Sequence, residues 1–259
     1  MTTNLFHTIS ELTQTRLAKA GISLRFGGVS KAPYTSLNLA SHVGDNPAAV
    51  SQNQRIFSAQ SGIHELKYCR QIHSDSVLNA DVVKTSFWNG ENQNVPEKTG
   101  DALISAQQGD ALGVFTADCV PIFILDTATP AIGMVHAGWR GTLARIAAKT
   151  LAQMKASFGT ITKNCLIHLG TSIQQCCYTV SSDMISQFVI HFGSAVHNGL
   201  NLSLQTANFC QLVEAGITPE SISISPFCTA CCTDKFYSYR AEGEQTGRML
   251  SFLQLTDTN

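Results

Sequence analysis

Three short apolar segments near the middle of the chain constrain its fold more than any other feature. They are Ala111–Thr116, Ile122–Leu125 and Ala131–Val135, and polar residues or proline bound each of them. Apolar runs of this length are typical of buried β-strands, because a helix in a core is usually longer, about ten residues or more. The most apolar stretch, Ala111–Leu125, is interrupted by an aspartate and a proline and is too short to span a bilayer. The sequence therefore predicts buried strands and no membrane partner.

Other patterns predict further strands and helices on both sides of this centre. Strands are expected at Ile22–Phe26, Cys165–Leu169, Phe236–Tyr239 and Met249–Leu255. Helices are expected from Asp45-Asn46-Pro47 to about Gln60, and over Thr142–Phe158, Ser182–Phe192 and Thr206–Ala215. The polar stretch Asn89–Gly100 predicts a surface loop. Because strands outnumber clean βαβ units, we expect one α+β domain over residues 1–259.

Composition excludes several classes of protein. The chain has 259 residues, of which 44% are hydrophobic and 14% charged, so it can bury a sizeable core. Lys and Arg number 17 against 18 Asp and Glu, so no basic excess favours a nucleic acid polymer, whereas a small anion needs only one or two arginines. Without a basic start and an apolar run at the N-terminus, we expect a cytoplasmic protein, in which the nine cysteines are thiols or metal ligands.

Three segments concentrate chemically reactive side chains: Arg70-Gln71-Ile72-His73, Thr116–Pro121 and Val135–Gly141. Cys119 follows one predicted strand and His136 ends another, and because neighbouring strand ends lie close together, these two residues can meet at one sheet edge. A thiolate and two imidazoles suit Zn²⁺, which then keeps an open fourth position, and copper is also chemically feasible. Spacing does not distinguish His73 from the other histidines, and an unligated buried cysteine is the alternative interpretation.

Two further patterns carry weaker predictions. Gly138 and Gly141 lie between a strand and a helix start, where backbone N–H groups and Arg140 would form an anion site or, alternatively, only a tight turn. Cys228-Thr229-Ala230-Cys231-Cys232 contains a C-x-x-C pair that would begin a structural zinc site if a second pair existed. The adjacent Cys176-Cys177 is a poor second pair, so we expect Cys231 and Cys232 to be unligated thiols.

Taken in order, the motifs resemble the YfiH-like laccase-domain family, also called the polyphenol oxidase or purine nucleoside phosphorylase family. The matching strings are Arg25–Ser30, Pro33–Ala40, His42–Asp45, Gln71–His73, Gly100–Ile104, Thr116–Pro121, His136–Gly141, Cys228-Thr229 and Phe236–Arg240. The resemblance implies a layered α/β/β/α sandwich with mixed sheets. It implies that His73, Cys119 and His136 bind zinc, and that the partners are purine nucleosides and inorganic phosphate.

The resemblance also implies a reaction class. Members of the family are expected to phosphorolyse adenosine, inosine, guanosine or methylthioadenosine, and to deaminate adenosine. Asp118 is then a candidate proton donor or a residue that orients a metal ligand. Arg140, Arg25 and Arg240 are candidates for binding phosphate, and Asn38, within a matched string, is expected to bind substrate.

Three alternatives use the same residues. Without a metal, Cys119 would be a nucleophile with His73 or His136 as its base, giving a cysteine hydrolase or amidase that acts on cell-wall precursors. A copper polyphenol oxidase is disfavoured because the histidines form no H-x-H pair. A nucleoside-binding relative without activity is the third, because the chain departs from the family pattern at Gly170-Thr171-Ser172, Tyr178-Thr179-Val180 and Leu200-Asn201-Leu202. There Thr179 replaces a glutamate.

Overall fold

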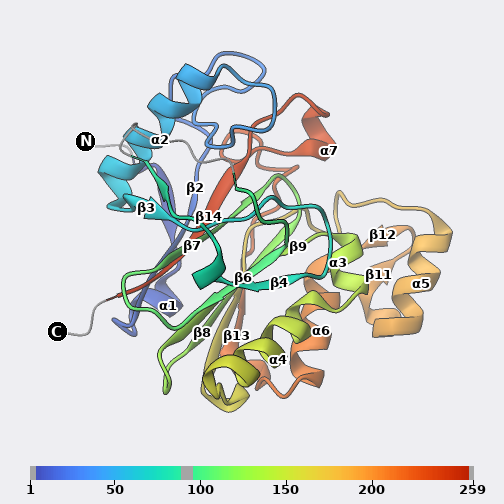
Figure 1. Ribbon diagram of the computed structural model, residues 1–259. Helices are drawn as coiled ribbons and strands as arrows, with labels where there is room; N and C mark the ends of the chain where they lie inside the picture. The colour runs from blue at the N-terminus through green and yellow to red at the C-terminus, as the bar shows by residue number, and fades with distance from the viewer. Residues whose placement is uncertain (1–3, 89–95, 257–259) are drawn as a thin grey trace.

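Two β-sheets pack face to face in the computed structural model, which describes residues 4–88 and 96–256 (Figure 1). The larger sheet has the strand order β13-β10-β8-β9-β6-β4. Its strands are β4 (Val77–Asn79), β6 (Ala102–Ser105), β8 (Val120–Asp126), β9 (Ala131–Ala137), β10 (Cys165–Leu169) and β13 (Ile222–Ile224). The antiparallel second sheet has the order β1-β2-β14-β7, with β1 (Phe6–Thr8), β2 (Ala18–Ser23), β7 (Ala111–Thr116) and β14 (Met249–Leu255).

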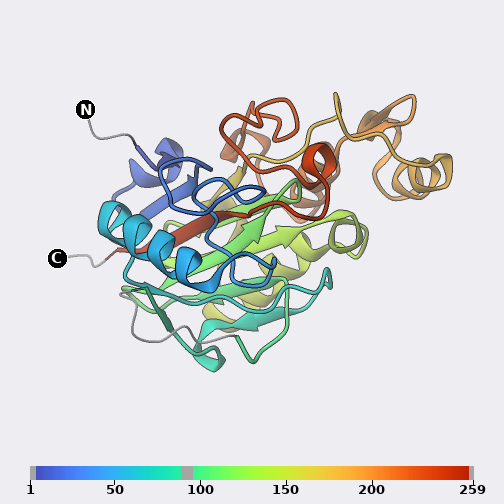
Figure 2. The same ribbon diagram turned by 90° about the horizontal axis from the view of Figure 1, so that it is seen from above.

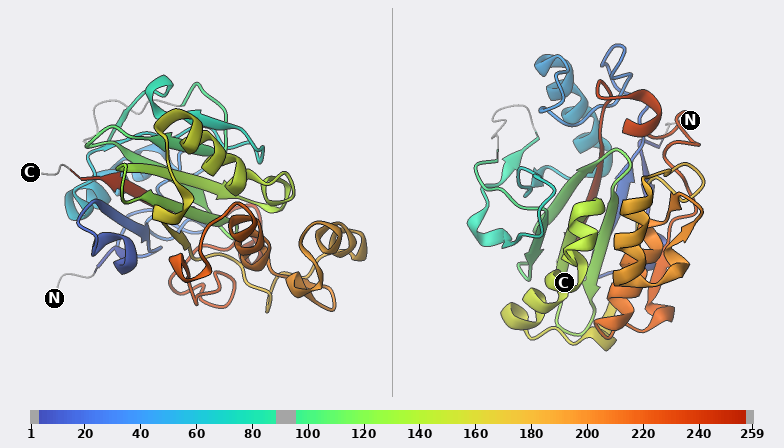
Figure 3. Two further views of the ribbon diagram at one scale, coloured as in Figure 1. Left: turned by 90° about the horizontal axis from the view of Figure 1, so that it is seen from below. Right: turned by 90° about the vertical axis from the view of Figure 1, so that its right-hand side faces the viewer.

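Helices cover the outer faces of both sheets: α4 (Ile146–Phe158) and α6 (Leu204–Glu214) lie over the larger sheet, and α2 (Pro47–Ser61) lies over the smaller one. The other helices are α1 (Ser10–Thr13), α3 (Trp139–Leu143), α5 (Ser182–Phe192) and α7 (Tyr239–Glu242). Figure 3 shows α4 and α6 side by side, and α5 lies at one edge of the molecule with the hairpin of β11 (His197–Asn198) and β12 (Asn201–Leu202) (Figure 2). The short pair β3 (Glu65–Leu66) and β5 (Ser86–Phe87) completes the strands of the described residues. Within this part of the chain, no helix is both long enough and apolar enough to cross a bilayer.

The strands are apolar on both faces because both faces are buried. Along β8, Ile122 and Ile124 pack in the core beneath α4 and α6, whereas Phe123 and Leu125 pack in the core between the two sheets. Successive side chains of a strand point to opposite faces, so a continuous apolar run serves two cores at once. On the far side, α2 packs against the smaller sheet, where Phe57 meets the ring of a β14 phenylalanine. The predicted α/β/β/α sandwich is therefore confirmed, and the larger sheet is mixed.

Most of the predicted elements form at or within a few residues of their expected positions. Strands β7, β10 and β14 and helix α5 have the predicted bounds. Helix α2 begins after Asn46, whose side chain accepts a hydrogen bond from the N–H of Ala48 at 2.9 Å, as the capping pattern predicted. The predicted loop at 89–100 lies in part outside the described residues.

Three predictions about secondary structure are wrong. The helix expected over Thr142–Phe158 is two helices, α3 and α4, separated by Arg145 in the left-handed conformation (φ 64°), although apolar periodicity continues across the break. The strand expected at Ile22–Phe26 ends at Ser23, because the backbone of Arg25 bonds to the loops at Lys235, Ser36 and Leu37. Phe236–Tyr239 is not a strand: the adjacent residues Phe236 and Tyr237 are both buried in a loop, and Ser238 caps α7.

A buried histidine in β10 makes the stability depend on pH. His168 is 8% exposed, its Nδ1 lies 2.8 Å from the Oγ of Ser223, and burial lowers its pKa to about 4. Between pH 6.5 and about 4 the unfolded chain binds a proton at this residue and the folded chain does not, so we expect stability to fall as the pH falls through this window. The loss approaches about 3 kcal/mol. Denaturant titrations at pH 7 and 5 should show a smaller loss for His168→Asn than for the wild type, and an equal loss would contradict the prediction.

Candidate metal centre

The structure brings His73, Cys119 and His136 together, and one ligand atom from each lies within 4.8 Å of the others. Strands β8 and β9 are antiparallel neighbours, with Val120 opposite Ala137, so Cys119, just before β8, lies beside the end of β9 that carries His136. His73 arrives from the loop between β3 and β4, and its ring lies edge-on to that of His136 with centroids 4.8 Å apart. The three residues come from three separate parts of the sequence.

A buried carboxylate, that of Asp101, holds two of the three side chains in place. One of its oxygens accepts hydrogen bonds from Nδ1 of His136 at 2.8 Å and from the backbone N–H of His73 at 3.0 Å. The other accepts from the backbone N–H and the hydroxyl of Ser74, both at 2.7 Å. Because Nδ1 of His136 donates to Asp101, its Nε2 is the nitrogen left for a metal, which is the usual arrangement for a ligating histidine.

Charges in the site favour the form of cysteine that binds metals. Burial raises the pKa of the Cys119 thiol, but the charges and hydrogen bonds of His136 and His73 outweigh burial and lower the pKa to about 6. Burial lowers the pKa of His136, but Cys119 and Asp101 outweigh it and raise the pKa to about 9. Hydrogen bonds from His136 and Ser74 overcome burial at Asp101 and lower its pKa to about 2. The site is thus built for a thiolate at neutral pH, which is the ligand form of cysteine.

Two residues of the site have strained backbones. His73 has a φ of 58° and Asp118 a φ of 94°, both in the left-handed region that disfavours side chains.

The Asp118 carboxylate accepts hydrogen bonds from the hydroxyls of Thr229 (2.6 Å) and Ser238 (2.7 Å) and from the backbone N–H of Arg240 (2.6 Å). Both oxygens of Asp118 are therefore engaged by the chain, and this residue connects the cysteine loop to α7.

Gly138 lets the cysteine and a histidine approach one another. A Cβ at this position would lie 2.9 Å from Nδ1 of His73 and 3.1 Å from Sγ of Cys119. The backbone of Gly138 has an ordinary φ of −75°, so only the space and not the conformation requires glycine.

Replacing Gly138 by alanine is expected to weaken metal binding without unfolding the protein. The added methyl group would push His73 and Cys119 apart, and a displacement of about 1 Å in such a site costs about 100-fold in rate. Metal content after dialysis, turnover and the thermal midpoint should be measured together. Full metal content in Gly138→Ala would show that the two side chains do not act on a common ion.

A cavity of about 520 Å³ opens beside His73, Cys119 and His136. Its wall combines aromatic residues with two arginines, and besides these three residues and Asp118 it is lined by His42, Gln71, Phe115, Thr116, Ala117, Trp139, Tyr178, Tyr239, Arg240 and Arg248. The guanidinium of Arg240 lies 5.0 Å from the centre of the Tyr178 ring and donates to the carbonyl of Thr179 at 2.9 Å. Volumes of this order are typical of sites for small molecules.

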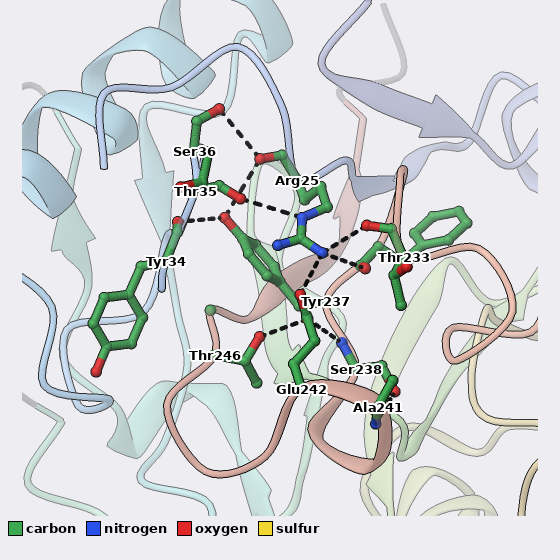
Figure 4. A network of polar contacts seen from close by, with 12 residues as sticks. Arg25, Tyr34, Thr35, Ser36, Thr233, Tyr237, Ser238, Ala241, Glu242 and Thr246 are labelled. Carbon is green, nitrogen blue, oxygen red and sulfur yellow. Dashed lines mark hydrogen bonds and ion pairs between the residues drawn. The ribbon is translucent and has the colours of Figure 1, made fainter. Parts of the chain in front are cut away.

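The structure divides the predicted substrate-binding residues into two groups. Arg140 and Arg240 are both exposed, but Arg240 lines the cavity, whereas Arg140 does not line it and lies over the Trp139 ring at 4.2 Å. Arg25 is outside the cavity lining: its guanidinium stacks over Tyr237 at 4.6 Å and bonds to Glu242 at 2.7 Å (Figure 4).

Asn38 also lies away from the cavity. It is fully buried, and its Oδ1 accepts from the backbone N–H of Arg248 at 3.1 Å, while its amide donates to Asp45 at 3.0 Å. Neither Arg25 nor Asn38 therefore lines the cavity, because both side chains are engaged inside the protein. Asn38 supports the cavity through Arg248, and Arg25 supports it through the loop that carries α7 (Figure 4).

Sequence reasoning missed three residues of this region. Asp101 lies inside one of the strings that resemble the family, but no feature of the sequence indicates its role. Tyr178 and Arg248 lie outside the sequence motifs that contain other residues of the cavity. Only the packing of distant segments brings these two side chains to the cavity wall. Thr179, at the departure from the family pattern, is exposed and bonds through its hydroxyl to Asn201 at 2.8 Å. Its side chain is not among the groups that line the cavity.

The chain is thus an α/β/β/α sandwich in which a cysteine and a histidine at neighbouring strand ends meet a second histidine from a loop, and this combination defines its class. The chain belongs to the family described as multi-copper polyphenol oxidoreductase laccase, whose model matches residues 19–256. This result confirms the resemblance drawn from the motifs.

Relatives and solved structures cover almost the whole chain. The purine nucleoside phosphorylase YlmD of Geobacillus stearothermophilus is 30% identical over 91% of this chain and 89% of its own length. An adenosine deaminase, RL5, from an unknown prokaryotic organism is 32% identical over 83% of this chain and 85% of its own length. The crystal structure of YfiH from Bacillus licheniformis superimposes with a TM-score of 0.84 at 28% identity, covering 98% of this chain and 100% of that one. The chain is therefore similar to enzymes.

Proposed function

We propose that the protein is a zinc-dependent purine nucleoside phosphorylase that also deaminates adenosine. One observation carries the proposal: the cysteine and the two histidines lie in the wall of a cavity that joins aromatic rings to two arginines. The rings match a purine and the arginines match a phosphate. The names of the relatives, which include phosphorylases and a deaminase, support the same substrates.

The donor set fits zinc. One thiolate and two imidazoles suit Zn²⁺ with an open position, and Asp101 orients His136 as a ligand requires. Bound there, zinc supplies Lewis-acid polarisation of a substrate atom. All histidines of the chain fall within the described residues, and only His73 and His136 belong to a group that can hold a metal. A multicopper site needs more than two histidine ligands, so we do not propose a multicopper oxidase.

The chain's own residues bind and orient the reactants. In phosphorolysis an oxygen of phosphate attacks C1′ of the ribose, the bond from C1′ to the purine nitrogen breaks, and the base leaves. Arg248 and Arg240 would hold the phosphate, and the rings of Tyr178 and Trp139 would flank the nucleoside. Asp118 acts as a positioning residue, because its bond to the backbone of Arg240 fixes that arginine beside the cavity.

A product assay tests the proposal. The purified protein is mixed with phosphate and either adenosine or inosine, and the products are separated. Free base and ribose 1-phosphate are expected from both nucleosides, and inosine and ammonia from adenosine alone. Absence of all these products from zinc-loaded protein would refute the proposal.

The arginines can be separated by kinetics. Arg248→Gln removes a cationic side chain of the cavity wall, so KM for phosphate should rise about tenfold, equivalent to about 1.4 kcal/mol, with a smaller change in kcat. Arg140→Gln is the matched control, because its side chain is exposed and does not line the cavity. A larger rise in Arg140→Gln than in Arg248→Gln would place the phosphate elsewhere.

A second candidate function rests on the chain from Asp101 through His136 to Cys119. The carboxylate bonds to Nδ1 of His136 at 2.8 Å, and the lowered pKa of Cys119 favours a nucleophilic thiolate. Without a metal, this arrangement would serve a cysteine hydrolase or amidase. Activity that survives chelation but is lost on thiol alkylation would favour the second candidate, and loss on chelation with recovery on adding zinc would favour the first.

A further inference from the structure

Four cysteines outside the candidate active site converge on one point. Cys176 and Cys177 come from the loop after β10, and Cys228 and Cys231 from the loop after β13. Their four sulfurs all lie within 4.8 Å of one another. We infer that these residues form a second, structural metal site that binds one zinc ion through four thiolates.

The spacing of the sulfurs fits one tetrahedral ion. Sγ of Cys177 lies 3.3 Å from that of Cys231, and Sγ of Cys176 lies 3.6 Å from Cys231 and 3.8 Å from Cys177. With metal–sulfur bonds of about 2.3 Å, tetrahedral geometry places sulfurs about 3.8 Å apart. A disulfide requires a separation of about 2.05 Å. An iron–sulfur cluster, with several atoms at its centre, would hold the cysteines farther apart than one ion does.

Backbone groups around Cys228 support a metal thiolate. The N–H of Gln174 donates to Sγ of Cys228 at 3.3 Å, and the N–H groups of Ala230 and Cys231 also face this sulfur. Such bonds to a ligating atom orient it and tune its binding. Cys228 is buried while Cys176 and Cys231 are exposed, so an ion can enter from the solvent side.

The two cysteine loops are already held in register by the backbone. Ser172 and Cys228 form a parallel β-bridge between the loops, and the N–H of Thr229 donates to the carbonyl of Ser172 at 3.1 Å. Within the second loop, the N–H of Cys232 donates to the carbonyl of Cys228 at 3.0 Å. The sequence-based expectation that the adjacent pair Cys176-Cys177 is a poor second pair took no account of this register. Two neighbouring residues supply two corners when the opposite loop supplies the other two.

The site would fix a wall of the catalytic cavity. Tyr178, which lines the cavity, follows Cys177 directly, and Thr229, which donates to Asp118 at 2.6 Å, follows Cys228. An ion held by both loops therefore restrains Tyr178 directly and Asp118 through Thr229, and both of these residues line the cavity. This role does not depend on which reaction the cavity supports.

Metal content tests the inference independently of activity. In a Cys119→Ser chain, which lacks a ligand of the first site, we expect one zinc per chain after reducing purification and dialysis. Adding Cys231→Ser should remove it and lower the thermal midpoint. Adding Cys232→Ser, a substitution of the neighbouring cysteine outside the cluster, should leave both unchanged. No zinc in Cys119→Ser, or zinc retained with Cys231→Ser, would overturn the inference.

Cobalt substitution and alkylation test the four-cysteine metal site even if Cys231→Ser fails to fold. Co²⁺ added to the metal-free Cys119→Ser chain should give the intense near-ultraviolet thiolate bands and visible bands of a tetrahedral thiolate site, and zinc should abolish them. With zinc present, the four clustered cysteines should resist iodoacetamide while Cys232 reacts. Absent bands, equal alkylation of all five, or a disulfide in the cluster of reduced protein would overturn the inference.

Discussion

Replacing Cys119 by serine is expected to remove the metal of the candidate active site and both proposed activities together. A serine hydroxyl is a much poorer zinc ligand than a thiolate, and the neighbouring imidazoles alone supply two ligands. We expect kcat/KM for phosphorolysis to fall at least about 1,000-fold, equivalent to about 4 kcal/mol of transition-state stabilisation. Zinc should fall by one equivalent per chain rather than to zero, because the four-cysteine site is unaffected.

Cys210→Ser serves as the control for this variant. Cys210 lies in α6 and belongs to neither group of clustered ligands, so its replacement should leave metal and turnover unchanged. Elemental analysis and the product assay on the same preparations check both expectations. Cys119→Ser that keeps its full zinc and full phosphorolysis would show that the site is wrongly assigned.

Replacing Asp101 by asparagine is expected to have the second largest effect. The carboxylate is fully buried and accepts hydrogen bonds from His136 and from the 72–74 backbone. In asparagine one acceptor oxygen becomes an N–H₂ donor that faces these donors. Loss of an orienting carboxylate typically weakens metal binding about 10- to 100-fold. The donors left unpaired should cost about 1–3 kcal/mol each in stability.

Asp75→Asn is the matched control because it removes a carboxylate from the same loop. Asp75 is partly exposed and pairs with Lys149 at the surface, where an ion pair contributes about 0–1 kcal/mol. Zinc affinity by chelator competition and unfolding by denaturant should therefore change in Asp101→Asn and hardly at all in Asp75→Asn. Equal effects of the two substitutions would mean that Asp101 does not orient the ligands.

Much of the fold could be predicted because its determinants are local. Short apolar segments predicted β7, β10 and β14, and a capping asparagine predicted the start of α2. The errors arose where local signals conflict with packing. Apolar periodicity runs across Arg145 although the helix breaks there, and Phe236 and Tyr237 have the pattern of a strand although they are buried in a loop.

The chain sequence by itself determined the strands, their double-sided apolar character and, through the motifs, the three residues proposed as zinc ligands. Only the tertiary structure decided which other groups surround them. Arg248 reaches the cavity and the four cysteines meet because strands distant in sequence are neighbours in the sheets, and the loops after them lie together. Hydrophobic patterns are local and can be read along the chain, whereas contacts between loops depend on the pairing of strands far apart in it.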